Sequence, residues 1–141
     1  MAVSLSPDGR WLLYVSTETG RNEVYVRPFP DWNRLRLPVS VGGGEAPLWS
    51  RDGKEIFYLS ADHRMMAVRF TAAVTPTLAA PVALFTVSPE LRTVETASYT
   101  PWDVAADGRF LMARRVGAGG ANTSPIVTEN FLTVLRERVG R

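Results

Sequence analysis

The stretch "SPDGRWLLYVS", from Ser6 to Ser16, decides the fold, because closely similar phrases occur twice more in the chain. The second copy, "SRDGKEIFYLS", runs from Ser50 to Ser60, and a more divergent third copy, "AADGRFLMARR", begins at Ala105. A phrase that recurs within one chain indicates that the fold is assembled from repeats of one supersecondary unit.

The spacing of the copies narrows the choice of repeat fold. The turn aspartates Asp8, Asp52 and Asp107 lie 44 and 55 residues apart. A period of about 40 to 50 residues with strand-like content is typical of propeller blades. We attribute the longer second interval to "VSPELRTVETAS", Val87 to Ser98, which is polar and has the character of an inserted surface loop.

Each copy begins with the residues of a tight hairpin. In the first copy, Pro7 suits the fixed φ of a type I turn, Asp8 follows, and Gly9 can adopt a positive φ. This combination predicts a short hairpin connection that ends in a left-handed glycine. The other two copies keep the aspartate and the glycine but lack the proline.

The segments after the turns predict four short strands per repeat. The strands "WLLYVS", "EIFYLS" and "FLMAR" are apolar and rich in β-forming residues. In the second copy both faces are largely apolar, as expected for an inner strand between neighbouring sheets. A second arm follows in each copy, as "EVYVRPF", "MMAVRF" and, after the glycine-rich loop "GAGGANTS", "PIVTENF". Outer strands are expected at Arg34 to Ser40 and at Ala80 to Val87.

The predicted fold is therefore all-β: a partial β-propeller of about three four-stranded antiparallel blades. The blade repeats are placed at about residues 1–40, 41–87 and 99–141. At the end of the chain, "NFLTVLRERVG" carries apolar residues at helical spacing and predicts a short C-terminal helix that packs on the last blade.

The composition excludes several classes of protein. Hydrophobic residues make up 45% of the 141 residues, which is typical of a chain with a packed core. The net charge of +2 is too small to indicate a nucleic-acid-binding protein. The chain has no cysteine, and no apolar run approaches the roughly 18 residues that cross a bilayer. The opening "MAVSLSPDGR" does not have the pattern of a signal peptide.

Several phrases resemble the WD40-like (PD40) repeats of TolB-type propellers. The resemblance rests on "SPDGRWLLYVSTETGRNEVYVRPFP", "GGGEAPLWSRDGKEIFYLS" and "WDVAADGRFLMARR", and it covers nearly the whole chain. The phrases are most similar to the C-terminal propellers of bacterial eukaryotic-like serine/threonine protein kinases. The resemblance implies a ring of six to eight blades used for recognition and assembly, often outside the cytoplasm.

About three blades make only part of such a ring. The chain resembles the C-terminal part of a larger propeller, and it contains no kinase-type glycine-rich loop or catalytic loop. A row of three blades leaves apolar faces at both ends, which favours a protein partner or self-association. For the chain on its own, we expect a homodimer that completes a six-bladed ring. No nucleic-acid partner and no direct membrane insertion are expected.

No catalytic, cofactor-binding or metal-binding set of residues is predicted. His63 is the only histidine and lies in a hairpin turn. It is the only possible base for a serine–histidine–acid triad, and one histidine does not supply the ligands of a zinc site. The repeated aspartates are explained by turn chemistry, although calcium binding at one of them stays open. The run "VGGGEAP", Val41 to Pro47, lacks the ending of a phosphate-binding loop and is interpreted as a connection between blades.

The aromatic residues of the strands are expected in the core between blades: Trp11, Tyr14, Trp49, Phe57, Tyr58, Trp102 and Phe110. A different group surrounds "VYVRPFPDWNR" and is the candidate recognition surface, because such residues dominate binding hot spots: Tyr25, Arg27, Phe29, Trp32 and Arg34.

The sequence thus favours a non-catalytic β-propeller segment for protein or ligand recognition. The alternatives are a sensor or regulatory portion of a serine/threonine kinase, the gating propeller of a peptidase, or a fragment with no role of its own.

Overall fold

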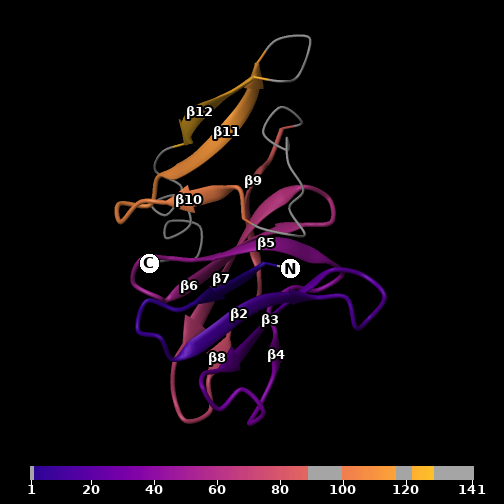
Figure 1. Ribbon diagram of the computed structural model, residues 1–141, viewed down its shortest axis with the longest axis vertical. Helices are drawn as coiled ribbons and strands as arrows, with labels where there is room; N and C mark the ends of the chain where they lie inside the picture. The colour runs from indigo at the N-terminus through magenta and orange to yellow at the C-terminus, as the bar shows by residue number, and fades with distance from the viewer. Residues whose placement is uncertain (1, 89–99, 117–121, 129–141) are drawn as a thin grey trace.

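The computed structural model describes residues 2–88, 100–116 and 122–128, and these residues form three antiparallel sheets (Figure 1). The first sheet has the order β1-β2-β3-β4. Its strands are β1 (Val3–Leu5), β2 (Trp11–Ser16), β3 (Glu23–Pro28) and β4 (Leu37–Pro38). The expected all-β architecture with antiparallel sheets is confirmed. Within the described part of the chain, no helix is long and apolar enough to cross a membrane.

The second sheet has five strands where four were expected. They are β5 (Gly44–Trp49), β6 (Glu55–Ser60), β7 (Arg64–Thr71), β8 (Thr77–Leu78) and β9 (Val82–Thr86). The additional strand arises because β7 is eight residues long and pairs with two different segments. Its C-terminal end pairs with β8, through Phe70 and Leu78, and its N-terminal half pairs with β9.

The third sheet, orange to yellow in Figure 1, has the order β10-β11-β12. Its strands are β10 (Trp102–Val104), β11 (Phe110–Val116) and β12 (Asn122–Thr128). The predicted start of the last arm was wrong, because β12 begins at Asn122 within the expected glycine-rich loop. The ladder with β11 continues to the pair Asn122–Val116, and Pro125 is compatible with the place of β12 at the edge of the described part of this sheet. The inserted loop and the C-terminal helix expected from the sequence lie outside the described residues.

The three sheets stack through two apolar cores. The first core joins the first and second sheets and includes Leu13, Val15 and Val26 on one side and Ile56 and Tyr58 on the other. Because alternate residues of a strand point to opposite faces, the neighbours of Ile56 and Tyr58 enter the second core. That core joins the second and third sheets: Ala46, Phe57, Leu59, Met65, Ala67, Leu84, Val87, Trp102, Val104, Phe110 and Met112.

Edge-to-face aromatic contacts link neighbouring sheets within both cores. In the first core, the rings of Trp11 and Phe70 lie 5.1 Å apart across the two sheets, and Trp49, in the same sheet as Phe70, lies 5.4 Å from it. In the second core, Phe57 and Phe110 lie 5.0 Å apart. Most of the aromatic residues expected between blades are therefore in these cores. Tyr14 is the exception, because it lies half-buried on the other face of β2.

The predicted hairpin turns are confirmed, with Gly9 at φ 72°, Gly53 at 71° and Gly108 at 90°. In the first two copies a serine completes the turn. The hydroxyl of Ser6 donates to Asp8 (2.6 Å) and accepts from the amide of Trp11 (3.1 Å). Ser50 makes the equivalent contacts in the second sheet.

The third copy has Ala105 in place of this serine, and its hairpin closes one residue earlier. The amide of Ala105 donates to the carbonyl of Arg109, whereas Ser6 donates to Trp11, the residue two positions after Gly9. As a result, Phe110 pairs with Val104 and turns towards the second sheet. The loss of one hydroxyl therefore accompanies a change of register.

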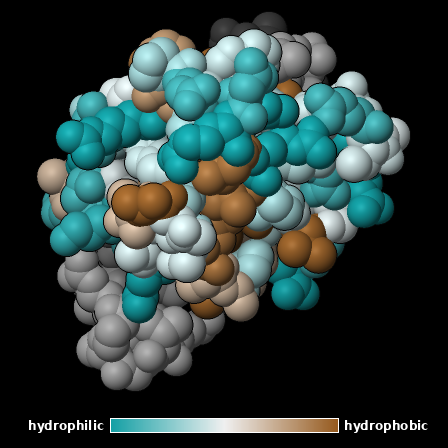
Figure 2. Space-filling view, turned by 90° about the horizontal axis from the view of Figure 1, so that it is seen from below, coloured by the Kyte–Doolittle hydropathy of each residue, from teal (hydrophilic) through white to brown (hydrophobic). Residues whose placement is uncertain are grey.

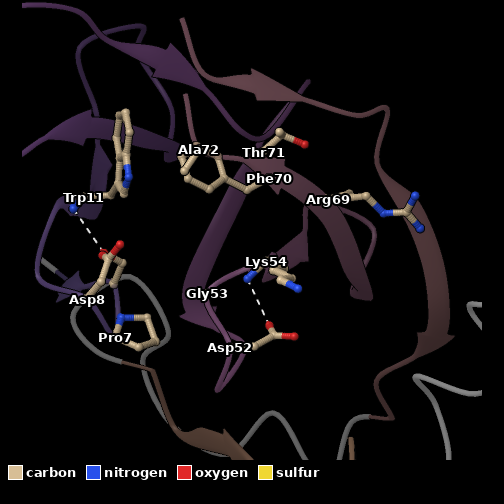
Figure 3. Close-up of a pocket in the computed structure, with 11 residues that line it drawn as sticks. Pro7, Asp8, Trp11, Asp52, Gly53, Lys54, Arg69, Phe70, Thr71 and Ala72 are labelled. Atoms are coloured by element: carbon tan, nitrogen blue, oxygen red, sulfur yellow. Dashed lines mark hydrogen bonds between the residues drawn. The ribbon is translucent and has the colours of Figure 1, made fainter. Parts of the chain in front are cut away.

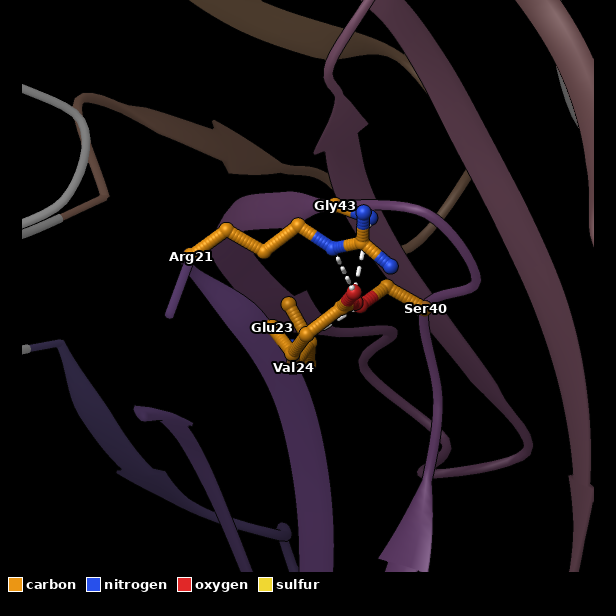
Figure 4. A network of polar contacts seen from close by, with 5 residues as sticks. All are labelled: Arg21, Glu23, Val24, Ser40 and Gly43. Carbon is orange, nitrogen blue, oxygen red and sulfur yellow. Dashed lines mark hydrogen bonds and ion pairs between the residues drawn. The ribbon is translucent and has the colours of Figure 1, made fainter. Parts of the chain in front are cut away.

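The connection between the first two sheets is held by a buried carboxylate (Figure 4). Glu23 accepts hydrogen bonds from the amide of Gly43 (2.9 Å), from Arg21 Nε (2.9 Å) and from the hydroxyl of Ser40. Burying a carboxylate is costly unless it is paired and hydrogen-bonded, and these three donors meet that requirement. A side chain at Gly44 would lie 2.5 Å from Ser40 Cβ, so the glycine run is needed for close packing. Its interpretation as a connection between blades is confirmed, because it joins β4 to β5.

We predict that His63→Gly stabilises the protein. His63 occupies the position that glycine fills in the related turns, with φ 65°, and a left-handed conformation is unfavourable for a residue with a Cβ. The free energy of unfolding in urea should rise by about 1 kcal/mol. Gly9→Ala is the matched control, since no atom lies within 4 Å of the added Cβ and only φ changes. It should lower the same free energy, and equal effects of the two variants would contradict the prediction.

Candidate recognition surface

The outer face of the first sheet is the face that points away from the second sheet. Cross-strand pairing places Val3, Tyr14 and Tyr25 in one row and Leu5, Leu12 and Arg27 in the next. Val3 and Leu5 are 58% and 45% exposed. No other sheet of the described residues covers this face.

Arg27 lies between two aromatic rings on the outer face. Its Nε donates to the hydroxyl of Tyr14 (2.6 Å), and one terminal nitrogen donates to the carbonyl of Trp32 (2.9 Å). The guanidinium carbon also lies 5.7 Å from the ring centre of Tyr14 and 5.5 Å from that of Trp32, within the range of cation–π attraction. These contacts fix the cation between two aromatic rings, so little side-chain entropy remains to be lost on binding.

A second arginine–aromatic pair lies beside the first. Tyr25 stacks on Tyr14 with ring centres 5.8 Å apart, and Arg36 lies 4.6 Å above the ring of Tyr25. Arg36 also pairs with Glu18, and the hydrogen bond that Arg36 donates to this carboxylate is the main reason why the pKa of Arg36 is raised. Both groups are exposed, so this ion pair contributes little to stability. It does neutralise the carboxylate at the rim of the outer face.

A hollow of about 260 Å³ lies among these groups and is lined by Val3, Leu12, Tyr14 and Trp32, with Arg27 and Glu18 as its charged members. Trp32 is 53% exposed, whereas the other three tryptophans are buried. Exposed aromatic side chains around a fixed arginine are the usual composition of a binding hot spot. The hollow can therefore accept an apolar side chain of a partner.

The structure brings together three of the five residues of the predicted surface. Tyr25, Arg27 and Trp32 belong to one cluster, although Tyr25 is buried under Arg36. Phe29 is 43% exposed at the end of β3. Arg34 differs, because it donates at 3.3 Å to the carbonyl of Val74 in the β7–β8 loop and so links the loop after β3 to that loop.

Sequence reasoning missed Tyr14, Leu12, Leu5, Val3 and Arg36. Tyr14 was expected in the core because it falls at a strand position between predicted blades. A usable signal was the β2–β3 hairpin, whose turn glycine at position 20 fixes the register that places Tyr14 beside Tyr25. Arg36 could not be found in this way, because it approaches from the following loop.

A larger hollow of about 460 Å³ lies between the aspartate turns of the first two sheets (Figure 3). Asp8, Asp52 and Lys54 are its charged members near the turns, and Trp11 and Phe70 form its apolar wall. The Oδ1 atom of each aspartate already accepts a serine hydroxyl and a backbone amide. These hydrogen bonds close the two turns, so the aspartates and serines at this hollow have a structural role.

The hydrogen bonds of the turns lower the pKa of both aspartates. For Asp8 the largest cause is the hydroxyl of Ser6, followed by the amide of Arg10. For Asp52 burial acts in the opposite direction, but the amide of Lys54 and the hydroxyl of Ser50 outweigh it. Among the residues that the structure describes, no three histidine, aspartate or glutamate side chains are grouped to hold a metal ion.

Apolar surface also appears at the end of the molecule near β4 and β8. Figure 2 shows this end from below, with a hydrophobic stripe between hydrophilic flanks. Leu37 in β4 and Leu78 in β8 are partly buried against the first core. The stripe is narrow, and the outer face of the first sheet remains the better candidate for recognition.

Comparison with known proteins supports the fold. The chain is similar to a solved oligogalacturonate lyase from Vibrio parahaemolyticus, with a TM-score of 0.55 and 17% identity over 82% of this chain and 28% of that one. It is also similar to TolB from Acinetobacter baumannii, with a TM-score of 0.40 and 15% identity over 90% of this chain and 40% of that one. The chain thus spans well under half of either structure. The described sheets have the β-propeller architecture. No family model matches the chain, and no curated protein matches it.

We predict that Ser6→Ala raises the pKa of Asp8 towards its ordinary value of 3.8, because the hydroxyl is the largest cause of the lowered pKa. A carboxyl group with a lowered pKa stabilises the folded state above that value and loses this effect as the pH falls through its folded pKa. The variant should therefore lose unfolding free energy at neutral pH, and lose less of it in strong acid.

Carbon-13 NMR titration of Asp8 and urea unfolding at both pH values check this prediction. Ser4→Ala is the control, since the hydroxyl of Ser4 contacts only a backbone carbonyl, at 3.5 Å. An unchanged Asp8 pKa in Ser6→Ala would contradict the assigned cause.

Proposed function

We propose that this chain is a non-catalytic β-propeller segment that recognises a protein partner through the outer face of its first sheet. The observation that carries the proposal is the position of Arg27 between Tyr14 and Trp32, beside the exposed side chains of Val3 and Leu5. A fixed cation, exposed aromatic surface and adjoining apolar side chains provide both affinity and orientation for a protein surface.

The burial pattern of the outer face favours a sheet as the partner. Leu5 and Leu12 are paired in the first sheet in the same way as Trp49 and Ile56 in the second. In the second sheet this pair is buried against the first sheet. A partner sheet would cover the outer face by the same packing.

The chemistry of the turns supports a non-catalytic role. Ser6 and Ser50 each donate to an aspartate and accept from a backbone amide, so their hydroxyls stabilise the hairpin turns. The repeats also resemble kinase-linked propellers. In a kinase of that kind, such a surface would act as a sensor.

We predict that Leu5→Asp reduces association of the purified chain. Light scattering over a range of concentrations should give a mass above 15.6 kDa for the unchanged chain, because association covers the apolar outer face. A charge at position 5 must be desolvated in any sheet-to-sheet contact, so the apparent dissociation constant should rise at least about tenfold.

Val41→Asp is the matched control, because Val41 is 82% exposed and lies in the β4–β5 connection away from the outer face. It should leave the mass unchanged. Equal association of Leu5→Asp and the unchanged chain would overturn the proposal, whereas a mass of one chain at every concentration would exclude self-association but not another protein partner.

A further inference from the structure

We propose, on the basis of the proposed function, that the partner is a second copy of this chain, which docks through the outer face of its third sheet. The surface on the second copy carries Asp103 and Leu111. Two such contacts, related by a two-fold axis, would join six sheets into one ring.

The sheets stack in one direction within the chain. Each sheet has one face that receives the preceding sheet and one that is presented to the following sheet. In the second sheet, Ile56 and Tyr58 receive the first sheet, while Phe57 and Leu59 are presented to the third. In the first sheet, Leu13 and Val15 are presented to the second. The direction is therefore the same at both internal interfaces.

The outer face of the first sheet is a receiving face. Leu12 and Tyr14 stand at the positions that Ile56 and Tyr58 occupy after the second turn, three and five residues beyond the turn glycine. The complement of a receiving face is a presenting face, not another receiving face. This favours head-to-tail docking over a contact between two first sheets.

The described part of the third sheet offers such a presenting face. Trp102, Val104 and Phe110 are buried against the second sheet. Asp103 and Leu111 lie directly opposite each other between these positions, so they point to the other side of the sheet. Leu111 is 46% exposed and the side chain of Asp103 is 56% exposed.

The two faces carry charged groups of opposite sign. On the receiving face, Leu12 lies opposite Arg27, and on the presenting face, Leu111 lies opposite Asp103. Each face thus pairs one leucine with one charged group, and the two charges have opposite signs. Arg27 uses one N–H on Tyr14 and one on Trp32, which leaves three of its five donors for a carboxylate.

Asp103 already has local partners in its own chain. Its Oδ2 accepts from Arg51 at 3.2 Å, and its Oδ1 accepts from the amide of Val104 at 2.8 Å. Both bonds leave lone pairs on these oxygens for further donors. Arg51 also donates to the carbonyl of Val104 at 2.8 Å, so the carboxylate is held in place at the surface.

The test is a complementation experiment with two variants, Leu5→Asp on the receiving face and Leu111→Asp on the presenting face. The unchanged chain should have twice the mass of 15.6 kDa, and each variant alone should be a monomer, because both contacts of its dimer are damaged. An equal mixture should form a heterodimer, since one contact then joins two undamaged faces. Val41→Asp is again the control, and thermal unfolding by circular dichroism establishes that each variant is folded.

Each outcome decides a different point. If Leu5→Asp abolishes association while Leu111→Asp does not, the outer face recognises another surface, so the inference fails and the proposed function stands. If the mixture stays monomeric at the highest concentration, head-to-tail docking is overturned. If Leu5→Asp has no effect, both the inference and the proposed function fail.

Discussion

The structure depends on the need to cover both faces of the second sheet. Four consecutive residues of β6, from Ile56 to Leu59, are buried. Because they alternate between faces, a single layer cannot cover them, and an apolar sheet is required on each side. Leaving a side chain such as Phe57 exposed would cost about 1.5 to 3 kcal/mol, so stacking on both sides is strongly favoured.

The hairpin turns decide how each sheet meets its neighbour. Where a serine begins the turn, its hydroxyl bridges the aspartate and a strand amide, as at Ser6 and Ser50. Where Ala105 replaces it, the ladder closes one residue earlier and Phe110 reaches the second core. A one-residue change of register reverses the face to which each side chain points, so a single turn residue affects the packing between two sheets.

The outer face of the first sheet combines two kinds of chemistry. Leu5 and Leu12 occupy the positions of a stacking face, whereas Arg27 and Trp32 add a fixed cation and an exposed indole that the second sheet does not have there. The recognition that we propose at this face would extend the packing that holds the chain together. The arginine would contribute direction, since apolar packing alone does not select a partner.

The sequence by itself determined the repeat, the left-handed turn glycines and the strands that are apolar on both faces, because these features arise from local backbone preferences and alternation. The sequence did not determine the cluster around Arg27, the link from Arg34 to Val74 or the start of β12 at Asn122. Only the tertiary structure decided these features, because they depend on cross-strand register and on contacts between segments far apart in the chain, which the packing of whole sheets sets.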